Sequence, residues 1–306
     1  MTLTEDQKAQ KEADKQTLQD IKKYGEARFI TMMVNYMDSS VKTRRKGLHV
    51  SNLVYPSLRK GYFEYLDQLN NNGRTNSAGM TEESLITLFM GQKFHEESLT
   101  PNHELGMEYK IIGGPLVYGT LDDMIMTRSR IVIFDKKTMK TTRTHPLPDY
   151  PNEHHRTQIE YYSVMLKAAK FIVSCKDCNK SWLSNFKPEA CSWCNKPEAL
   201  SIGEAPSCEG RDFFGEVIYI GVGLTRKSKG VPFKIDVNKA EMSLNEKLIA
   251  IGKALETGIP PSAEYGWWDD YASEFYIASR LLDAGEANWR DYLPFDPTKQ
   301  VDSNVR

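Results

Sequence analysis

Long apolar runs are missing from this chain of 306 residues: none approaches the ~20 residues that a membrane-spanning helix needs. The first residues, 1–8, are polar and lack the apolar core of a secretory signal peptide. These absences exclude a membrane partner. They predict a cytoplasmic, intracellular protein, whether of cellular or viral origin.

An excess of charge of one sign is also missing, because 40 Lys and Arg residues face 41 Asp and Glu residues. A strongly basic overall field is therefore excluded, although a nucleic-acid partner needs only a local positive groove. Repeats and low-complexity tracts are absent as well, which excludes solenoid architectures. The chain is long enough for one large domain or two modest ones.

Cysteine is scarce, but four of the five cysteines lie close together as Cys175, Cys178, Cys191 and Cys194. Two Cys-x-x-Cys motifs at this separation are typical of a tetrahedral four-thiolate site in a reducing compartment. Structural Zn²⁺ suits this ligand set best, with an iron–sulfur cluster as the alternative. The remaining Cys208 is expected to be only a small packing residue.

Basic and aromatic residues surround the two cysteine motifs. Two roles are open for them: contact with nucleic acid or a partner protein, or covering and solvating the motifs. The residues concerned are Lys176, Lys180, Trp182, Lys187 and Trp193.

Two predicted strands, 116–125 and 131–137, form a hairpin about Arg128 and Ser129. Strand side chains alternate between the two faces of a sheet, so consecutive acidic residues in the first strand point in opposite directions.

In this hairpin Asp122 lies directly opposite Asp135, at a cross-strand distance of about 5 Å where like charges repel. A divalent cation between them would remove the repulsion. Lys137 falls on the same face as Asp135, two residues on, whereas alternation points Asp123 to the other face. Two carboxylates and one amine therefore converge on one candidate catalytic site.

A helix predicted over about 156–172 carries Gln158 and Tyr162, which share one face because they are four residues apart. Taken alone, this pair is equally typical of a helix that packs Tyr162 into the core. His103, His154 and His155 are predicted to lie in loops.

The segments 119–122, 133–138 and 158–162, in this order, resemble the RecB-type branch of the PD-(D/E)XK nuclease superfamily. Within that branch the chain is similar to the CRISPR-associated RecB-like exonucleases and their phage relatives. The resemblance covers 48–174 and, more faintly, 212–283. It implies an α/β (α+β) fold with a restriction-endonuclease-like core, in which helices flank a mixed sheet.

The segment 91–96 matches the helix that supplies a metal-binding histidine in that branch, which points to His95. The resemblance also implies Mg²⁺ or Mn²⁺ as the catalytic cofactor, since hard oxygen ligands suit magnesium and an imidazole favours manganese. The implied metal ligands are His95, Asp122, Asp135 and the backbone carbonyl of Lys136. The implied catalytic residues are Asp122, Asp135, Lys137, Gln158 and Tyr162.

Many relatives carry a Cys-Pro-Arg signature in the segment that corresponds to 50–62. In those relatives its cysteine holds an iron–sulfur cluster together with three cysteines near the C-terminus. Here Tyr55 or Ser57 stands in place of that cysteine, and the corresponding C-terminal segment, 260–270, has no cysteine. We therefore expect the usual cluster to be absent. Arg59 and Lys60 match the basic end of the signature and are predicted phosphate contacts, with a surface helix pair as the alternative.

These features predict a PD-(D/E)XK core that is interrupted by a zinc-ribbon-like insert. The predicted units are an N-terminal helical segment (1–46), two parts of the nuclease core (47–174 and 209–290), the insert (175–208) and a C-terminal tail (291–306).

The function expected from these units is that of a metal-dependent DNA exonuclease or end-processing enzyme in recombination, repair or phage replication. Its expected partner is linear DNA, single- or double-stranded, with a recombination or replication protein as a further candidate. Two alternatives remain open. One is a nucleic-acid-binding or assembly factor with a vestigial site, and the other is a sequence-specific endonuclease.

Overall fold

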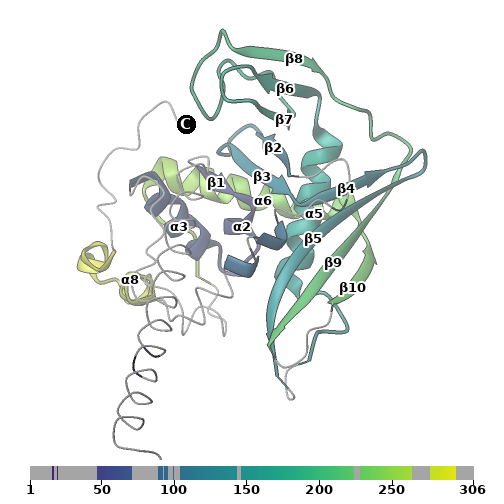
Figure 1. The fold of residues 1–306 in the computed structure, drawn as a ribbon. Coiled ribbons are helices and arrows are strands. Elements are labelled where there is room, and N and C mark those ends of the chain that lie inside the picture. The colour runs from purple at the N-terminus through teal and green to yellow at the C-terminus, as the bar shows by residue number, and fades with distance from the viewer. Residues whose placement is uncertain are drawn as a thin grey trace, which may run out of the picture.

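A computed structural model describes residues 47–70, 104–142, 146–223, 228–263 and 276–293, together with 16, 19, 89–91, 93–95 and 99. The predicted N-terminal segment and C-terminal tail therefore fall almost wholly outside the described residues, as do His103 and the start of the helix that leads to His95. The described part is an α+β fold in which helices flank two mixed β-sheets (Figure 1).

The first sheet has six strands in the order β1-β3-β2-β7-β6-β8. β1 runs parallel to β3, and β2 pairs antiparallel with β3 and parallel with β7. β6 lies antiparallel between β7 and β8. The strands that flank the two cysteine motifs, β6, β7 and β8, therefore extend this first, central sheet. The strands are β1 (Leu48–His49), β2 (Leu105–Tyr109), β3 (Val117–Leu121), β6 (Phe171–Cys175), β7 (Lys180–Ser184) and β8 (Leu200–Glu204).

The second sheet has four strands in the order β10-β9-β5-β4, namely β4 (Asp123–Met126), β5 (Arg130–Thr141), β9 (Asp212–Gly223) and β10 (Ser228–Lys234). β5 and β9 are parallel along their whole length and are drawn as two long neighbouring arrows in Figure 1. β4 and β5 form the predicted hairpin, whose turn is closed by a 2.8 Å hydrogen bond from the Thr127 N–H to the Arg130 carbonyl.

The predicted strand 116–125 is not one strand, and this part of the prediction is wrong. The chain leaves the first sheet after Leu121, bends at Asp122 and enters the second sheet at Asp123. The apolar pattern of β3 stops at Leu121 and resumes only at Met124, so Asp122 and Asp123 interrupt the alternation where the chain changes sheet. The bend places Asp122 at the junction of the two sheets.

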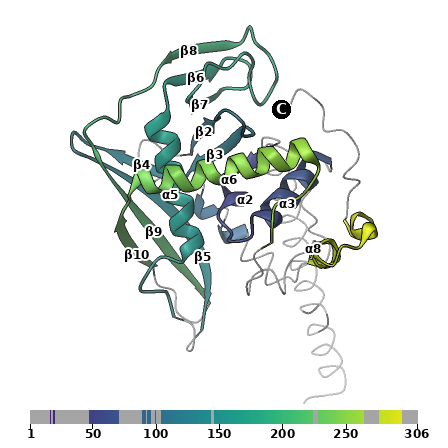
Figure 2. The same cartoon turned by 180° about the vertical axis from the view of Figure 1, so that it is seen from behind.

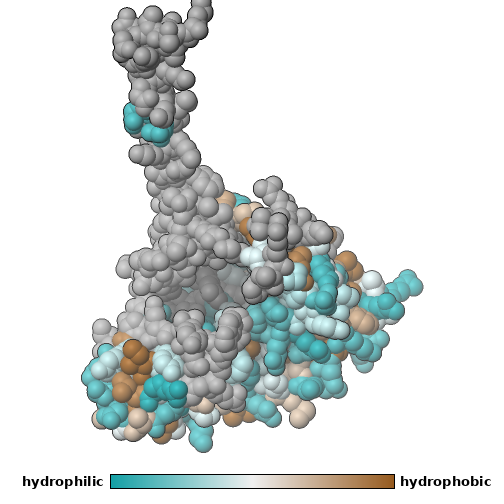
Figure 3. Space-filling model, turned by 90° about the horizontal axis from the view of Figure 1, so that it is seen from below, coloured by the Kyte–Doolittle hydropathy of each residue, from teal (hydrophilic) through white to brown (hydrophobic). Residues whose placement is uncertain are grey.

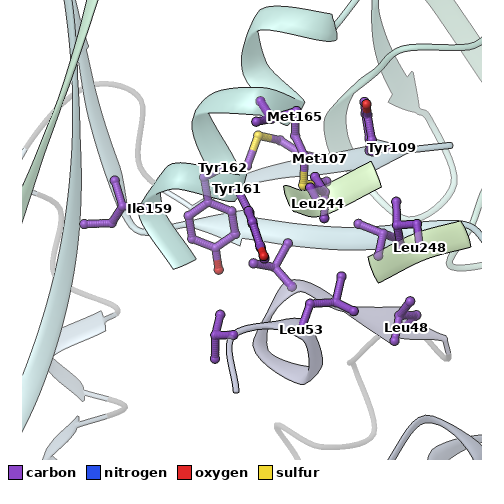
Figure 4. Close-up of a cluster of buried hydrophobic side chains, with 14 of the residues drawn as sticks. Leu48, Leu53, Met107, Tyr109, Ile159, Tyr161, Tyr162, Met165, Leu244 and Leu248 are labelled. Carbon is purple, nitrogen blue, oxygen red and sulfur yellow. The ribbon is translucent and has the colours of Figure 1, made fainter. Parts of the chain in front are cut away.

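Helix α5 (Glu153–Ala168) packs against both sheets and against α6 (Val237–Thr257), as the rear view shows (Figure 2). Its apolar face supplies Ile159, Tyr161 and Met165 to the main core, where they meet strand residues and α6 side chains (Figure 4). Burial of such a stripe is the main source of stability for a helix in a globular protein. α5 thus connects the two sheets through one core.

The predicted helix 156–172 corresponds to α5 and differs from it at both ends. α5 begins at Glu153, before the predicted start at 156. α6 begins at Val237, because Asp236 caps it and accepts a hydrogen bond from the Lys239 N–H. The other helices are α2 (Val50–Leu53), α3 (Leu58–Asn70), α8 (Tyr276–Asp283) and the 3-10 helix η1 (Ala287–Tyr292).

None of the described helices combines the length and the apolar character needed to cross a bilayer. On the face drawn in Figure 3, hydrophilic side chains predominate among the described residues and hydrophobic ones are scattered.

Candidate functional site

Asp122 occupies the bend between the two sheets, where its carboxylate is mostly enclosed. One oxygen, Oδ2, accepts a 2.7 Å hydrogen bond from the backbone N–H of Lys136 in β5. The other, Oδ1, lies 2.8 Å from Nδ1 of His95. The bend therefore joins a strand of the first sheet, a strand of the second sheet and the histidine predicted as a metal ligand.

Asp135 lies opposite Asp122 when the β4–β5 register, in which Asp123 pairs with Phe134, is continued by one residue. Asp135 is buried, and its Oδ1 accepts a 2.8 Å hydrogen bond from Nζ of Lys137. The predicted convergence of two carboxylates and one amine is thus present in the structure.

The second oxygen of Asp135, Oδ2, is buried and has no hydrogen-bond partner among the described residues. Burial raises the pKa of Asp135 to about 6; the charge of Lys137 opposes this rise and the charge of Asp122 adds to it. A buried carboxylate oxygen without a partner is costly, and a cation beside it would remove that cost. Two carboxylates and an imidazole are ligand types that divalent ions such as Mg²⁺ or Mn²⁺ accept.

Gln158 and Tyr162 lie one turn apart on α5, and the Gln158 amide donates a 2.8 Å hydrogen bond to the Tyr162 hydroxyl. The ring of Tyr162 packs against β3, where a side chain at Gly119 would lie only 3.0 Å from it. The pair is therefore both part of the core and connected to the strand that leads to Asp122.

His154 and His155 do not lie in a loop, because both belong to the first turn of α5. The imidazole of His155 lies 3.0 Å from the hydroxyl of Tyr219, which is the ladder partner of Lys137. Burial, together with the charges of His154 and Lys137, lowers the pKa of His155 to about 2. A partly buried, neutral imidazole thus lies beside the candidate site.

The contact of His155 with Tyr219 was not predicted from the sequence, whereas a local signal was available for the neighbouring His154. His154 is four residues before Gln158, which is four before Tyr162, so the three share one helix face. Nothing in the sequence indicated the pairing of Tyr219 with Lys137.

Arg59 is not a phosphate contact, so that prediction is wrong. Its guanidinium is buried and donates to the carbonyl of Pro261, to Ser279 and to the carboxylate of Asp283, the last at 2.7 Å. It therefore connects α3 to α8 and has no surface left for a ligand. Nζ of Lys60 lies 4.1 Å from the centre of the Tyr55 ring.

The sulfur atoms of the four clustered cysteines all lie within 4.8 Å of one another. Sγ of Cys175 is 3.6 Å from Sγ of Cys194, and Sγ of Cys178 is 3.6 Å from Sγ of Cys191. Four sulfurs at ~2.3 Å from a tetrahedral zinc ion are ~3.8 Å apart. The cluster is therefore a candidate metal centre with suitable spacing.

Each cysteine motif ends in an asparagine in the left-handed conformation, Asn179 with φ 58° and Asn195 with φ 56°. The N–H of Asn179 bonds to the carbonyl of Cys175 at 3.0 Å, and that of Asn195 to the carbonyl of Cys191 at 2.8 Å. Asparagine tolerates this conformation better than most residues. Both motifs thus form the same tight turn, which brings two sulfurs together in each.

A second, small core lies beneath the cysteines and includes Val173 and Trp182. The ring of Trp182 is fully buried and meets Trp193 edge-on at 5.0 Å between centroids. Of the two roles open for these tryptophans, Trp182 has the covering role, because a fully buried ring cannot contact nucleic acid. Lys196 bonds to Asp177 at 2.5 Å and so joins the two motifs.

Comparison with known proteins does not name a family for this chain. No protein-family model matches it, and no curated protein matches it. Among solved structures, the crystal structure of SSO0001 is similar over 79% of this chain and 90% of that chain, with 12% sequence identity and a TM-score of 0.38. A similarity at this level assigns no activity.

Proposed function

We propose that this protein is a divalent-metal-dependent DNA nuclease related to the RecB-type PD-(D/E)XK enzymes. The observation that carries the proposal is the buried Oδ2 of Asp135, which has no partner among the described residues and lies beside Asp122 and Lys137. Packing alone gives no reason to bury a carboxylate in this way, whereas a metal-dependent hydrolase needs one.

The residues that would hold the catalytic ion are His95, Asp122, Asp135 and the backbone carbonyl of Lys136. When bound, Mg²⁺ or Mn²⁺ supplies the Lewis acidity that activates water and stabilises charge on the scissile phosphate. Oδ2 of Asp135 is the ligand atom that the protein leaves available. Oδ1 of Asp122 lies 2.8 Å from Nδ1 of His95, so these two ligand atoms are neighbours.

Lys137 provides the positive charge in this site. Its Nζ is partly exposed and is held by the Asp135 carboxylate, so it can donate a second hydrogen bond to water or to a phosphate oxygen. There it would orient the attacking water and stabilise the negative charge that develops on the phosphate. Gln158 and Tyr162, on the adjacent helix α5, would position the substrate backbone.

The four-thiolate cluster would hold Zn²⁺ in a structural role. The backbone N–H of Cys178 lowers the pKa of the Cys175 thiol to about 7, which favours the thiolate that a metal requires. The spacing of the sulfurs suits zinc, and an iron–sulfur cluster is the alternative. We propose linear DNA as the partner, with exonuclease or end-processing activity in recombination, repair or phage replication.

End-labelled single- and double-stranded linear DNA, assayed beside a closed circle with Mg²⁺ or Mn²⁺, tests the proposal. We expect metal-dependent loss of linear DNA, reduced by at least about 10²-fold in Asp135→Asn, the effect of removing one preorganised electrostatic group. Asp149→Asn, a change at an exposed carboxylate, is the matched control.

Cutting of the closed circle would assign the site to an endonuclease. DNA binding without cleavage of any substrate would overturn the proposal in favour of a binding or assembly factor.

A further inference from the structure

Behind the candidate site, on the opposite face of the β4–β5 hairpin, lies a buried ion pair. Asp123 and Lys136 are neighbours in sequence of Asp122 and Asp135, and alternation points their side chains away from the site. Nζ of Lys136 lies 3.0 Å from Oδ2 of Asp123, and the two side chains are 4% and 0% exposed. Desolvation offsets much of the attraction in an ion pair buried this deeply, so its contribution to stability does not by itself explain its presence.

Both members of the pair also bond to backbone in the segment that supplies His95. Nζ of Lys136 donates to the carbonyl of His95 at 3.3 Å, and Oδ1 of Asp123 accepts from the N–H of Leu99 at 3.0 Å. Two backbone positions four residues apart are thus anchored to the back of the hairpin.

His95 is therefore held from two sides. Its imidazole meets Asp122 at 2.8 Å, and its carbonyl meets Lys136. The same segment approaches β5 closely at Gly91, where a Cβ would lie 2.8 Å from Oγ1 of Thr138. His95 lies in a helical stretch and not in a strand, so among the described residues it is these contacts that fix its position relative to the carboxylates.

We propose that Asp123 and Lys136 are positioning residues, which hold His95 against the metal site and so set its preference for Mn²⁺ over Mg²⁺. This inference rests on the proposed function. Two carboxylates and a carbonyl suit both ions, whereas an imidazole binds Mn²⁺ better than Mg²⁺. Displacing His95 should therefore weaken Mn²⁺ binding and leave Mg²⁺ binding nearly unchanged.

The test measures dissociation constants of the full chain for Mn²⁺, directly, and for Mg²⁺, by competition. The main variant is the double change Asp123→Asn with Lys136→Met, which removes both charges and leaves no unpaired charge in the interior. Asparagine keeps the acceptor for the Leu99 N–H, so of the two bonds to the His95 segment the variant removes the one to the His95 carbonyl. Thermal unfolding checks that the double variant folds cooperatively.

We expect the double variant and His95→Ala each to weaken Mn²⁺ binding about tenfold or more, the first by loss of an outer partner of the ligand and the second by loss of the ligand itself. Binding of Mg²⁺ should change by less than about twofold. Adding His95→Ala to the double variant should cause no further loss, because both changes act through one imidazole. A general loss of stability would not alter the ratio of the two affinities.

Lys247→Met is the matched control, since Lys247 also donates to backbone carbonyls, those of Leu53 and Tyr55, away from the site. A double variant that folds and keeps the wild-type preference for Mn²⁺, while Asp135→Asn abolishes binding, overturns this inference alone. Wild-type Mn²⁺ binding that Asp135→Asn leaves intact overturns the proposed function, and this inference with it.

Discussion

The cysteine cluster and the carboxylate site are both candidate metal centres, but they are assembled in opposite ways. All four sulfurs come from one stretch, 175–194, and lie within 4.8 Å of one another. The carboxylate site takes His95 from one segment, Asp122 from the junction of two sheets and Asp135 from β5. The first centre is local in sequence and the second is not.

This difference determines what each centre depends on. The cysteine turns are held by their own backbone hydrogen bonds and by a small separate core. The carboxylate site depends on strand register, on the packing of α5 and on the buried pair Asp123–Lys136. We therefore expect a change in the main core to disturb the carboxylate site first, and a change in a cysteine to leave that site in place.

The largest effect is expected from Cys178→Ala. Loss of one of four thiolates should lower the zinc content from about one ion per chain to near zero, because structural zinc contributes binding energy of about 10–16 kcal/mol in small zinc domains. Metal analysis measures the content, and amide exchange should show lost protection over 171–204. Cys208→Ala, which lies outside the cluster, is the control and should retain zinc.

The same Cys178→Ala protein should still bind Mn²⁺ at the carboxylates. If its Mn²⁺ binding disappears together with zinc, the two centres are not independent and the comparison fails. The pairing of β7 with β2 is the route through which such coupling would pass.

An intermediate effect is expected from Gly119→Val in β3. The new Cβ would lie 3.0 Å from the Tyr162 ring and 3.2 Å from Sδ of Met165, which forces α5 to shift. Overpacking of this kind costs about 1–3 kcal/mol of unfolding free energy, measured by denaturant titration.

Zinc content should not change in Gly119→Val. Together with Cys178→Ala, this result would show that each centre can be disturbed without the other. Gly203→Val in β8 is the matched control, because its Cβ would make an ordinary 3.4 Å contact with Ile172. Equal destabilisation by the two valines would contradict the expected dependence of the site on α5.

The smallest effect is a pH dependence that His155 confers on the carboxylate region. The pKa of folded His155 is about 2, against an ordinary value of 6.5. Below pH 6.5 the unfolded chain therefore binds a proton that the folded chain does not, so stability falls as the pH drops. Above pH 6.5 this residue has no effect. The slope is at most about 1.4 kcal/mol per pH unit.

In His155→Gln the unfolding free energy should change less between pH 6.5 and 5 than in the wild type, as denaturant titrations at several pH values would show. The segment 171–204 contains no histidine, so acid acts there through thiolate protonation, which is common to both proteins. Parallel pH profiles for the two proteins would show that folding does not lower the pKa of His155, and would contradict this prediction.

Parts of both centres could be predicted because their signals are local. Two Cys-x-x-Cys motifs predicted the sulfur cluster. The hairpin about Arg128 and Ser129 predicted that Asp122 and Asp135 would face each other, since strand pairing follows directly from the position of the turn.

Other parts could not be predicted because they depend on contacts between distant segments. Arg59 is buried by contacts with 261–283, which no pattern near Arg59 indicates. The change of sheet at Asp122 and the pairing of Lys137 with Tyr219 likewise arise only when separate strands meet.

The sequence by itself determined which side chains can hold metal and in which pairs they face each other, because motif spacing and strand alternation act within a few residues. Only the tertiary structure decided that β6, β7 and β8 would extend the central sheet and that Asp122 would stand where two sheets meet. It also decided that Asp123 and Lys136 would form hydrogen bonds with the backbone of the segment that contains His95. These features require the long-range burial of apolar surface, which brings together segments that have no local reason to be neighbours.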